Sequence, residues 1–226
     1  MSKSSRSSGQ LELPVLVLPE MVLFPRMTMS LALYEERELA ILEDLIAAAR
    51  GPERPRFVFS LSQWDAPYPL EVRPNPVGTL TELVRWDEGA SPERKILIRG
   101  LERVQISKIT RQDPYMKATI EPLERGGWTA PSGGASQEEH LSILRRQAQQ
   151  IAFSREGTGL GSVLNTLEWI KEAGALADYI AQHLLADSYL KQEILEMTDP
   201  AERIRTLLDV LRAGVPEGKD AAEGEK

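Results

Sequence analysis

Few residues of the chain have the types and spacing that enzyme chemistry needs. Ser188 and Lys191 lie three positions apart, so on a helix they share one face, as a lysine-activated serine nucleophile must. Such pairs also arise by chance on many helices, and we interpret this pair as structural. A cryptic Ser/Lys hydrolase therefore remains only the last alternative, and we predict no catalytic residue.

Metal and cofactor sites are disfavoured by what the sequence lacks. The 226 residues include no cysteine and two histidines, His140 and His183, which we expect on helix surfaces. The glycine-rich segment 157–162 precedes a helical pattern, but no strand comes before it and no lysine follows it, as a phosphate loop requires. We predict neither a metal nor a cofactor.

Charge and hydropathy restrict the classes of partner. A formal net charge of -7 disfavours broad attraction to nucleic acid or to an anionic membrane. No apolar run is long enough to span a bilayer. The first apolar segment is interrupted by Pro14, Pro19 and Glu20, unlike the core of a secretion leader. We therefore expect a cytoplasmic protein without membrane contact.

The first half of the chain carries strand patterns around a single helix. After a flexible tail over 1–10, we predict seven strands, at 11–18, 27–31, 56–61, 77–86, 95–99, 104–110 and 115–121. Apolar residues at helical spacing predict one amphipathic helix over 35–50. Gly100 is placed at a chain reversal between two strands, where the positive φ of a tight turn suits glycine. These patterns predict a closed or partly closed β structure over 11–123.

The composition changes after this β-rich part. A glycine-rich stretch over 124–136 predicts a linker, and apolar residues at helical intervals then predict a helical bundle over 137–213. The charged segment 214–226 is predicted to be disordered. The predicted fold class is α+β.

Several short motifs occur in an order that resembles one family. They are Leu13-Pro14-Val15-Leu16-Val17-Leu18-Pro19, Leu23-Phe24-Pro25, Arg99-Gly100-Leu101-Glu102-Arg103-Val104, Leu176-Ala177-Asp178-Tyr179-Ile180-Ala181 and Lys191-Gln192-Glu193-Ile194-Leu195-Glu196, followed by Arg203. Together they resemble the amino-terminal substrate-binding domain of Lon proteases. The resemblance implies a PUA-like β barrel with one main helix, followed by a helical bundle. It also implies that the matching signature residues, Pro25, Gly78, Arg99, Gly100, Arg103, Gln192 and Arg203, serve the fold first.

The same resemblance implies a protein-binding function. The sequence contains no G-x-x-x-x-G-K-[ST] string for an ATPase and has no room for the family's peptidase. We therefore expect a stand-alone, non-catalytic module that binds unfolded or tagged proteins or a protease partner. Apolar residues predicted to contact such proteins are Leu23, Phe24, Met27, Trp64 and Tyr68. A homodimer is possible, because one weak site would need avidity.

Two signature residues and their basic neighbours leave alternatives open. Arg99 and Arg103 could each grip a carboxylate of a partner, although we favour a salt bridge or carbonyl contact that holds the predicted turn. Since PUA-like barrels elsewhere bind RNA, an RNA-binding module is the first alternative function. It would use Arg94, Lys95, Arg99, Arg103, Lys108 and Arg111, but the interleaved aromatic residues that stack on bases are missing.

Overall fold

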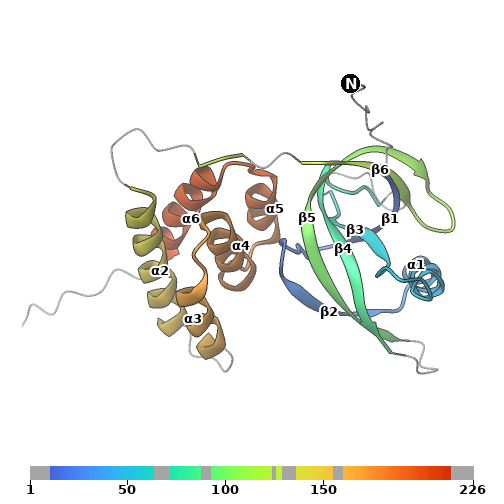
Figure 1. Cartoon of the computed structure of the whole chain (residues 1–226), viewed down its shortest axis with the longest axis horizontal. Coiled ribbons are helices and arrows are strands. Elements are labelled where there is room, and N and C mark those ends of the chain that lie inside the picture. Colours follow the sequence, from blue (N-terminus) through green and yellow to red (C-terminus); the bar gives the residue numbers. More distant parts are fainter. Residues whose placement is uncertain are drawn as a thin grey trace, which may run out of the picture. The chain divides into compact units, whose positions relative to one another are not determined.

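The chain forms two compact units. The computed structural model describes residues 11–63, 72–87, 93–123, 126–128, 136–154 and 160–214. One unit comprises residues 1–125 together with 185–198, and the other comprises residues 126–184 together with 199–226. The first holds all the strands of the described chain, and the elements described in the second are helices (Figure 1). The predicted α+β fold class is confirmed.

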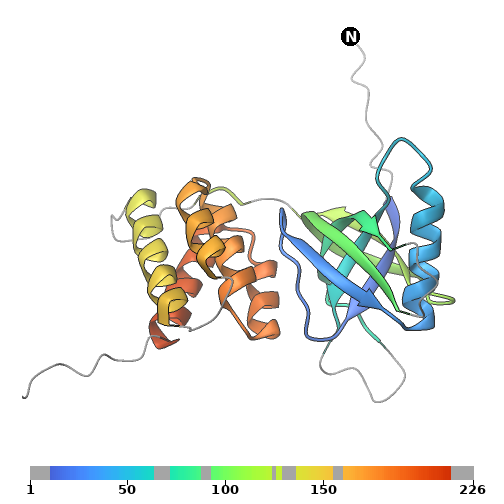
Figure 2. The same ribbon diagram turned by 90° about the horizontal axis from the view of Figure 1, so that it is seen from below.

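The described part of the first unit contains six strands and two helices. Their bounds are β1 Leu11–Leu18, β2 Thr28–Leu33, α1 Glu36–Ala48, β3 Arg56–Leu61, β4 Val77–Trp86, β5 Arg94–Arg111, β6 Lys117–Pro122 and α5 Ser188–Glu196. The strands are hydrogen-bonded in the order β2-β5-β4-β3-β1-β6, and β5 also pairs with β6. This extra pairing makes the sheet nearly close into a ring (Figure 2).

Strand β5 is the element that closes the ring. Its first half pairs with β2 from Arg94 to Arg99, and its second half pairs with β6 from Val104 to Arg111. Strand β4 runs antiparallel to both halves, with register shifts at two places. Strands β1 and β3 form the one parallel pair described. The residues that face inward form a buried cluster of Val15, Val58, Leu80, Val104, Ala118 and Ile120.

The predicted turn at Gly100 was wrong, because β5 runs unbroken through this residue. Glycine is needed here for close approach, not for a positive φ. The Gly100 amide donates to Met27 O at 2.9 Å, and Gly100 O accepts from the Arg26 amide at 2.8 Å. A Cβ on Gly100 would lie 2.5 Å from the Phe24 carbonyl oxygen. The two strands predicted at 95–99 and 104–110 are therefore one.

Helix α1 lies alongside the strands, outside the ring (Figure 2). It buries Ile41, Leu42 and Leu45 on one face, as the spacing of apolar residues predicted. Its start is fixed by Glu38, whose Oε2 accepts the backbone amides of Tyr34 at 3.0 Å and Glu35 at 3.2 Å. A carboxylate in the first turn satisfies amides that have no partner within the helix.

Helix α5 belongs to the strand-containing unit, so the bundle predicted as continuous over 137–213 is interrupted. Gln192, which is 5% exposed, donates from Nε2 to Val77 O of β4 at 2.9 Å. Arg103 of β5 donates from Nε to Leu195 O at 2.8 Å, near the end of α5. These two contacts join α5 to the sheet through backbone carbonyls.

The second unit contains the remaining helices of the described chain. Their bounds are α2 Gln137–Ser154, α3 Leu160–Trp169, α4 Ala173–Leu184 and α6 Pro200–Gly214. A buried ion pair links α4 to α6, with Arg203 Nε 3.5 Å from Asp178 Oδ1 and both side chains 7% exposed. Gly174 leaves room for this pair, because a Cβ there would lie 2.6 Å from an Arg203 nitrogen.

We predict that Gly100→Ala lowers the free energy of unfolding by about 2 kcal/mol or more, as overpacking against backbone does. The added methyl would collide with the Phe24 carbonyl, which is held in place by the loop. Urea unfolding measures the change. Gly161→Ala is the matched control, because a Cβ at Gly161 meets nothing within 4 Å. Equal stability of the two variants would contradict the close contact.

We also predict that Arg203→Met destabilises the protein by about 3–5 kcal/mol, because it leaves the Asp178 carboxylate buried without its cation. Thermal and urea unfolding of the variant would show this loss. Arg212→Met removes an exposed ion pair to Asp209 on the same helix and should change stability by less than about 0.5 kcal/mol. A small effect at Arg203 would refute the role given to the buried pair.

Candidate functional site

The loop that precedes β2 contains three of the predicted binding residues, and it buries them. Leu23, Phe24 and Met27 are 1%, 0% and 9% exposed. Pro25 and Arg26 occupy the centre of a turn that is closed by a 3.2 Å hydrogen bond from Met27 N–H to Phe24 O. Arg26 has φ 68°, the left-handed value that a type II turn requires after its proline. Because these three side chains are buried, they leave little surface for contact with another protein, and their role in binding stays a prediction.

The other two predicted binding residues, Trp64 and Tyr68, lie outside the described residues.

The position of Phe24 has a clear physical reason. The Arg103 guanidinium lies 5.8 Å from the centre of its ring, and the Thr79 hydroxyl holds the neighbouring carbonyl of Leu23 at 2.5 Å. The loop is therefore part of the core.

The two signature arginines of β5 have internal partners. Arg103 donates to the Leu195 carbonyl, and Arg99 forms an ion pair with Glu82, whose side chain is 10% exposed. Glu82 also receives the Arg54 guanidinium at 3.4 Å. These contacts agree with the structural alternative, a salt bridge and a carbonyl contact, although the element that they hold is a strand and not a turn.

Gly78 and Gln192 also serve the fold. A Cβ on Gly78 would lie 2.8 Å from the Phe59 carbonyl oxygen, so β4 can approach β3 this closely only with glycine there. The Gln192 side chain donates to the carbonyl of Val77, the residue that precedes Gly78. The signature residues within the first unit thus cluster at the contacts between its strands, its loop and α5.

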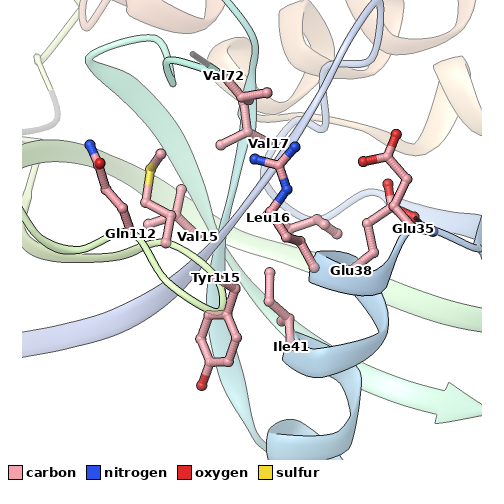
Figure 3. Close-up of a pocket in the computed structure, with 11 residues that line it drawn as sticks. Val15, Leu16, Val17, Glu35, Glu38, Ile41, Val72, Gln112 and Tyr115 are labelled. Atoms are coloured by element: carbon pink, nitrogen blue, oxygen red, sulfur yellow. Dashed lines mark hydrogen bonds between the residues drawn. The ribbon is translucent and has the colours of Figure 1, made fainter. Parts of the chain in front are cut away.

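A small pocket lies between β1, the start of α1 and the connection from β5 to β6 (Figure 3). It has a volume of about 110 Å³ and is lined by Val15, Leu16, Val17, Glu35, Arg37, Glu38, Ile41, Val72, Gln112, Tyr115 and Met116. The volume is below the range of about 300–1,000 Å³ typical of small-molecule sites. None of the lining residues is a serine, threonine, lysine or histidine. The pocket could admit one side chain, and the groups in its lining that could act as nucleophiles are the carboxylates of Glu35 and Glu38 and the Tyr115 hydroxyl.

Tyr115 is the titratable residue of this pocket with a clear pKa shift. Burial, reinforced by the hydrogen bond that its hydroxyl donates to Asp44, raises the pKa of Tyr115 to about 12. Arg111 lies 4.8 Å from the ring centre. Tyr115 therefore stays protonated at neutral pH and ties the turn before β6 to helix α1.

The described contacts of Ser188, Lys191 and the two histidines do not form a catalytic or metal-binding arrangement. Burial lowers the pKa of Lys191, and Ser188 is 8% exposed, yet within the described chain no hydrogen bond joins the two side chains. His140 stands edge-on to Trp128, and His183 packs against Tyr179. No group of three or more potential metal ligands occurs among the described residues.

The basic residues considered for RNA lie along β5, and most have internal contacts. Arg94 donates to the Asp87 carbonyl at 2.6 and 3.1 Å, Arg99 and Arg103 are paired as above, and Arg111 contacts Tyr115. A phosphate-binding stripe needs side chains free to reach outward. This arrangement disfavours the RNA alternative.

Two solved structures share this fold. The N-terminal domain of the Mycobacterium avium complex Lon protease matches with a TM-score of 0.64 at 18% identity, covering 89% of this chain and 98% of that one. The Lon N-terminal domain protein from Xanthomonas campestris matches with a TM-score of 0.60 at 19% identity, covering 91% and 99%. The chain therefore has the fold of these two N-terminal domains.

Sequence comparison gives the family. The family model described as the ATP-dependent protease La (LON) substrate-binding domain matches residues 12–213, and the chain belongs to this family. The Lon protease of Lawsonia intracellularis is 29% identical over 198 residues, and that of Xanthomonas oryzae pv. oryzae is 28% identical over 207. These matches cover 87% and 89% of this chain but 23% of each relative.

We predict that the pKa of Tyr115 is about 12 in the folded protein, above the value of an unperturbed tyrosine. An unperturbed tyrosine ionises at about pH 10. A pKa of about 12 in the folded state means that the folded chain keeps the Tyr115 proton to a higher pH than the unfolded chain does. The stability that Tyr115 contributes is complete below pH about 10 and is lost as the pH rises to about 12. A difference absorbance titration against Tyr115→Phe measures the pKa, which Asp44→Asn should lower. A midpoint at pH about 10 would contradict the contact.

Proposed function

We propose that this chain is a non-catalytic protein-recognition domain that binds unfolded segments or tags of other proteins. The observation that carries the proposal is the match of residues 12–213 to a family described as a substrate-binding domain. The relatives are Lon proteases, and the substrates of a protease are polypeptides. A partner protease could receive what the domain captures.

The features of the described residues support binding over catalysis. The lining of the pocket in Figure 3 contains no serine, threonine or lysine, and the Ser188 and Lys191 side chains share no hydrogen bond. No helix in the described ranges has the length and apolar character to cross a membrane. We place the domain in the cytoplasm, where unfolded chains and proteases meet, and propose that self-association would strengthen weak single-site binding.

We predict saturable binding of the full chain to fluorescent, permanently unfolded casein, with micromolar affinity, because an unfolded client loses conformational entropy when it is held. Fluorescence anisotropy measures the affinity, and light scattering gives the oligomeric state in parallel. A folded globular protein of similar size and charge is the control. Absence of binding by a well-folded sample would overturn the proposal.

We predict no cleavage of casein, with or without ATP, and no binding to RNA oligonucleotides at low salt. Turnover that Ser188→Ala abolishes would establish the hydrolase alternative. RNA binding that weakens steeply with salt would establish the other alternative, because release of counterions from phosphates has that signature.

A further inference from the structure

Strand β2 ends the order of hydrogen-bonded strands, so one of its edges has no neighbouring strand in the described chain. It pairs with β5 from Thr28 to Leu33 along one side. Thr28, Ser30 and Ala32 are exposed, whereas Leu31 and Leu33 are buried. The strand, which Figure 2 shows crossing in front of the ring, therefore presents exposed side chains on one face beside its unpaired edge.

The register shows which backbone groups point outward. Gly100 N–H donates to Met27 O, so Met27 and Gly100 form a hydrogen-bonded pair. In an antiparallel ladder such pairs alternate, and the backbone groups of Thr28, Ser30 and Ala32 therefore point away from β5. Within the described residues no hydrogen bond is recorded for their N–H and C=O groups. The next residue whose amide points outward is Tyr34, and its N–H donates to Glu38 Oε2. The open edge therefore ends at Tyr34, just before α1 begins.

This edge lacks the features that usually prevent strands from pairing with other chains. Natural edge strands are blunted by lysine, proline, inward-pointing charges or bulges. The β2 sequence Thr28-Met29-Ser30-Leu31-Ala32-Leu33 contains no charge and no proline, and its pairing with β5 has no register shift. Exposed and unprotected edges of this kind serve as templates for an added strand.

The surface beside the edge is hollowed and carries two basic residues, Arg85 and Lys95, together with the acidic Asp87. An open cavity of about 610 Å³ is lined by Ser30, Leu31, Ala32, Arg85, Trp86, Asp87, Lys95, Ile96 and Leu97. Lys95 is 75% exposed at its side chain and lies 4.0 Å from Glu93, and Arg85 is exposed. Trp86 and Leu97 supply apolar surface in the same hollow. A segment that combines apolar and acidic side chains would complement it.

From these observations we propose that β2 captures an extended segment of an unfolded polypeptide as an additional strand. The backbone of Thr28, Ser30 and Ala32 supplies the hydrogen bonds, and the hollow beside Trp86 accepts the segment's apolar side chains. Arg85 and Lys95 favour segments that carry acidic residues. This inference rests on the proposed function and assigns it a surface.

The test is the titration of fluorescent unfolded casein, an acidic client, with the full-length Ser30→Pro variant. Proline removes the outward N–H without removing a bond to β5, so we expect affinity to fall by about tenfold or more. Glu53→Pro, in the exposed loop between α1 and β3, is the matched control. Urea unfolding verifies that each variant folds. A folded Ser30→Pro variant with wild-type affinity would overturn the assignment of β2 and leave the proposed function intact.

A second variant tests the same surface if Ser30→Pro does not fold. Replacing both Arg85 and Lys95 by serine should weaken casein binding several-fold and flatten its salt dependence. Arg212→Ser, an exposed change on α6, should do neither. If light scattering shows a wild-type dimer that Ser30→Pro converts to a monomer, a second copy of this chain occupies the edge. That result would overturn the proposal that an unfolded segment binds there. If wild-type protein does not bind casein, both the proposed function and this inference fail.

Discussion

The contact between Gly100 and the loop over 23–27 is the constraint on which the first unit depends. Two backbone hydrogen bonds join them, and no side chain fits between Gly100 and the Phe24 carbonyl. Because glycine lets the loop lie this close, β5, which is 18 residues long, continues past it unbroken. The same strand then pairs with β2 in its first half and β6 in its second, and so nearly closes the ring. The buried Phe24 and the Arg103 guanidinium over its ring hold the loop against this strand.

Local patterns were enough to predict most of the strands. Strands β1, β3 and β4 have the predicted bounds, because burial on the inner face imposes an apolar pattern that can be read along the chain. The continuity of β5 could not be predicted in this way. Glycine between charged residues is typical of a turn, and only the distant loop explains its place in a strand. Helix α5 poses the same problem, since Gln192 and Val77 are 115 positions apart. Helical spacing shows which face is apolar but not which partner covers it.

Which of the candidate binding residues are buried could not be predicted, for a related reason. Apolar side chains in a loop can form either a core or an exposed patch, and Leu23 and Phe24 belong to the core. Composition alone could not decide this, because the burial comes from tertiary contacts. The edge of β2 depends on strand order and was not predicted either. One signal was present in the sequence, however, since the half-buried strand predicted at 27–31 contains no charge or proline.

Recognition through a strand edge suits a domain whose clients differ in sequence. The peptide backbone is common to all of them, and in folded proteins its hydrogen-bonding groups are mostly satisfied already. An open edge therefore distinguishes unfolded chains from folded ones through the backbone, while the side chains beside the edge select among segments. Three outward residues can make only a few hydrogen bonds, each with a net value of about 1 kcal/mol. Such binding is weak and readily reversible, so a captured segment can pass onward, and strong retention requires several copies acting together.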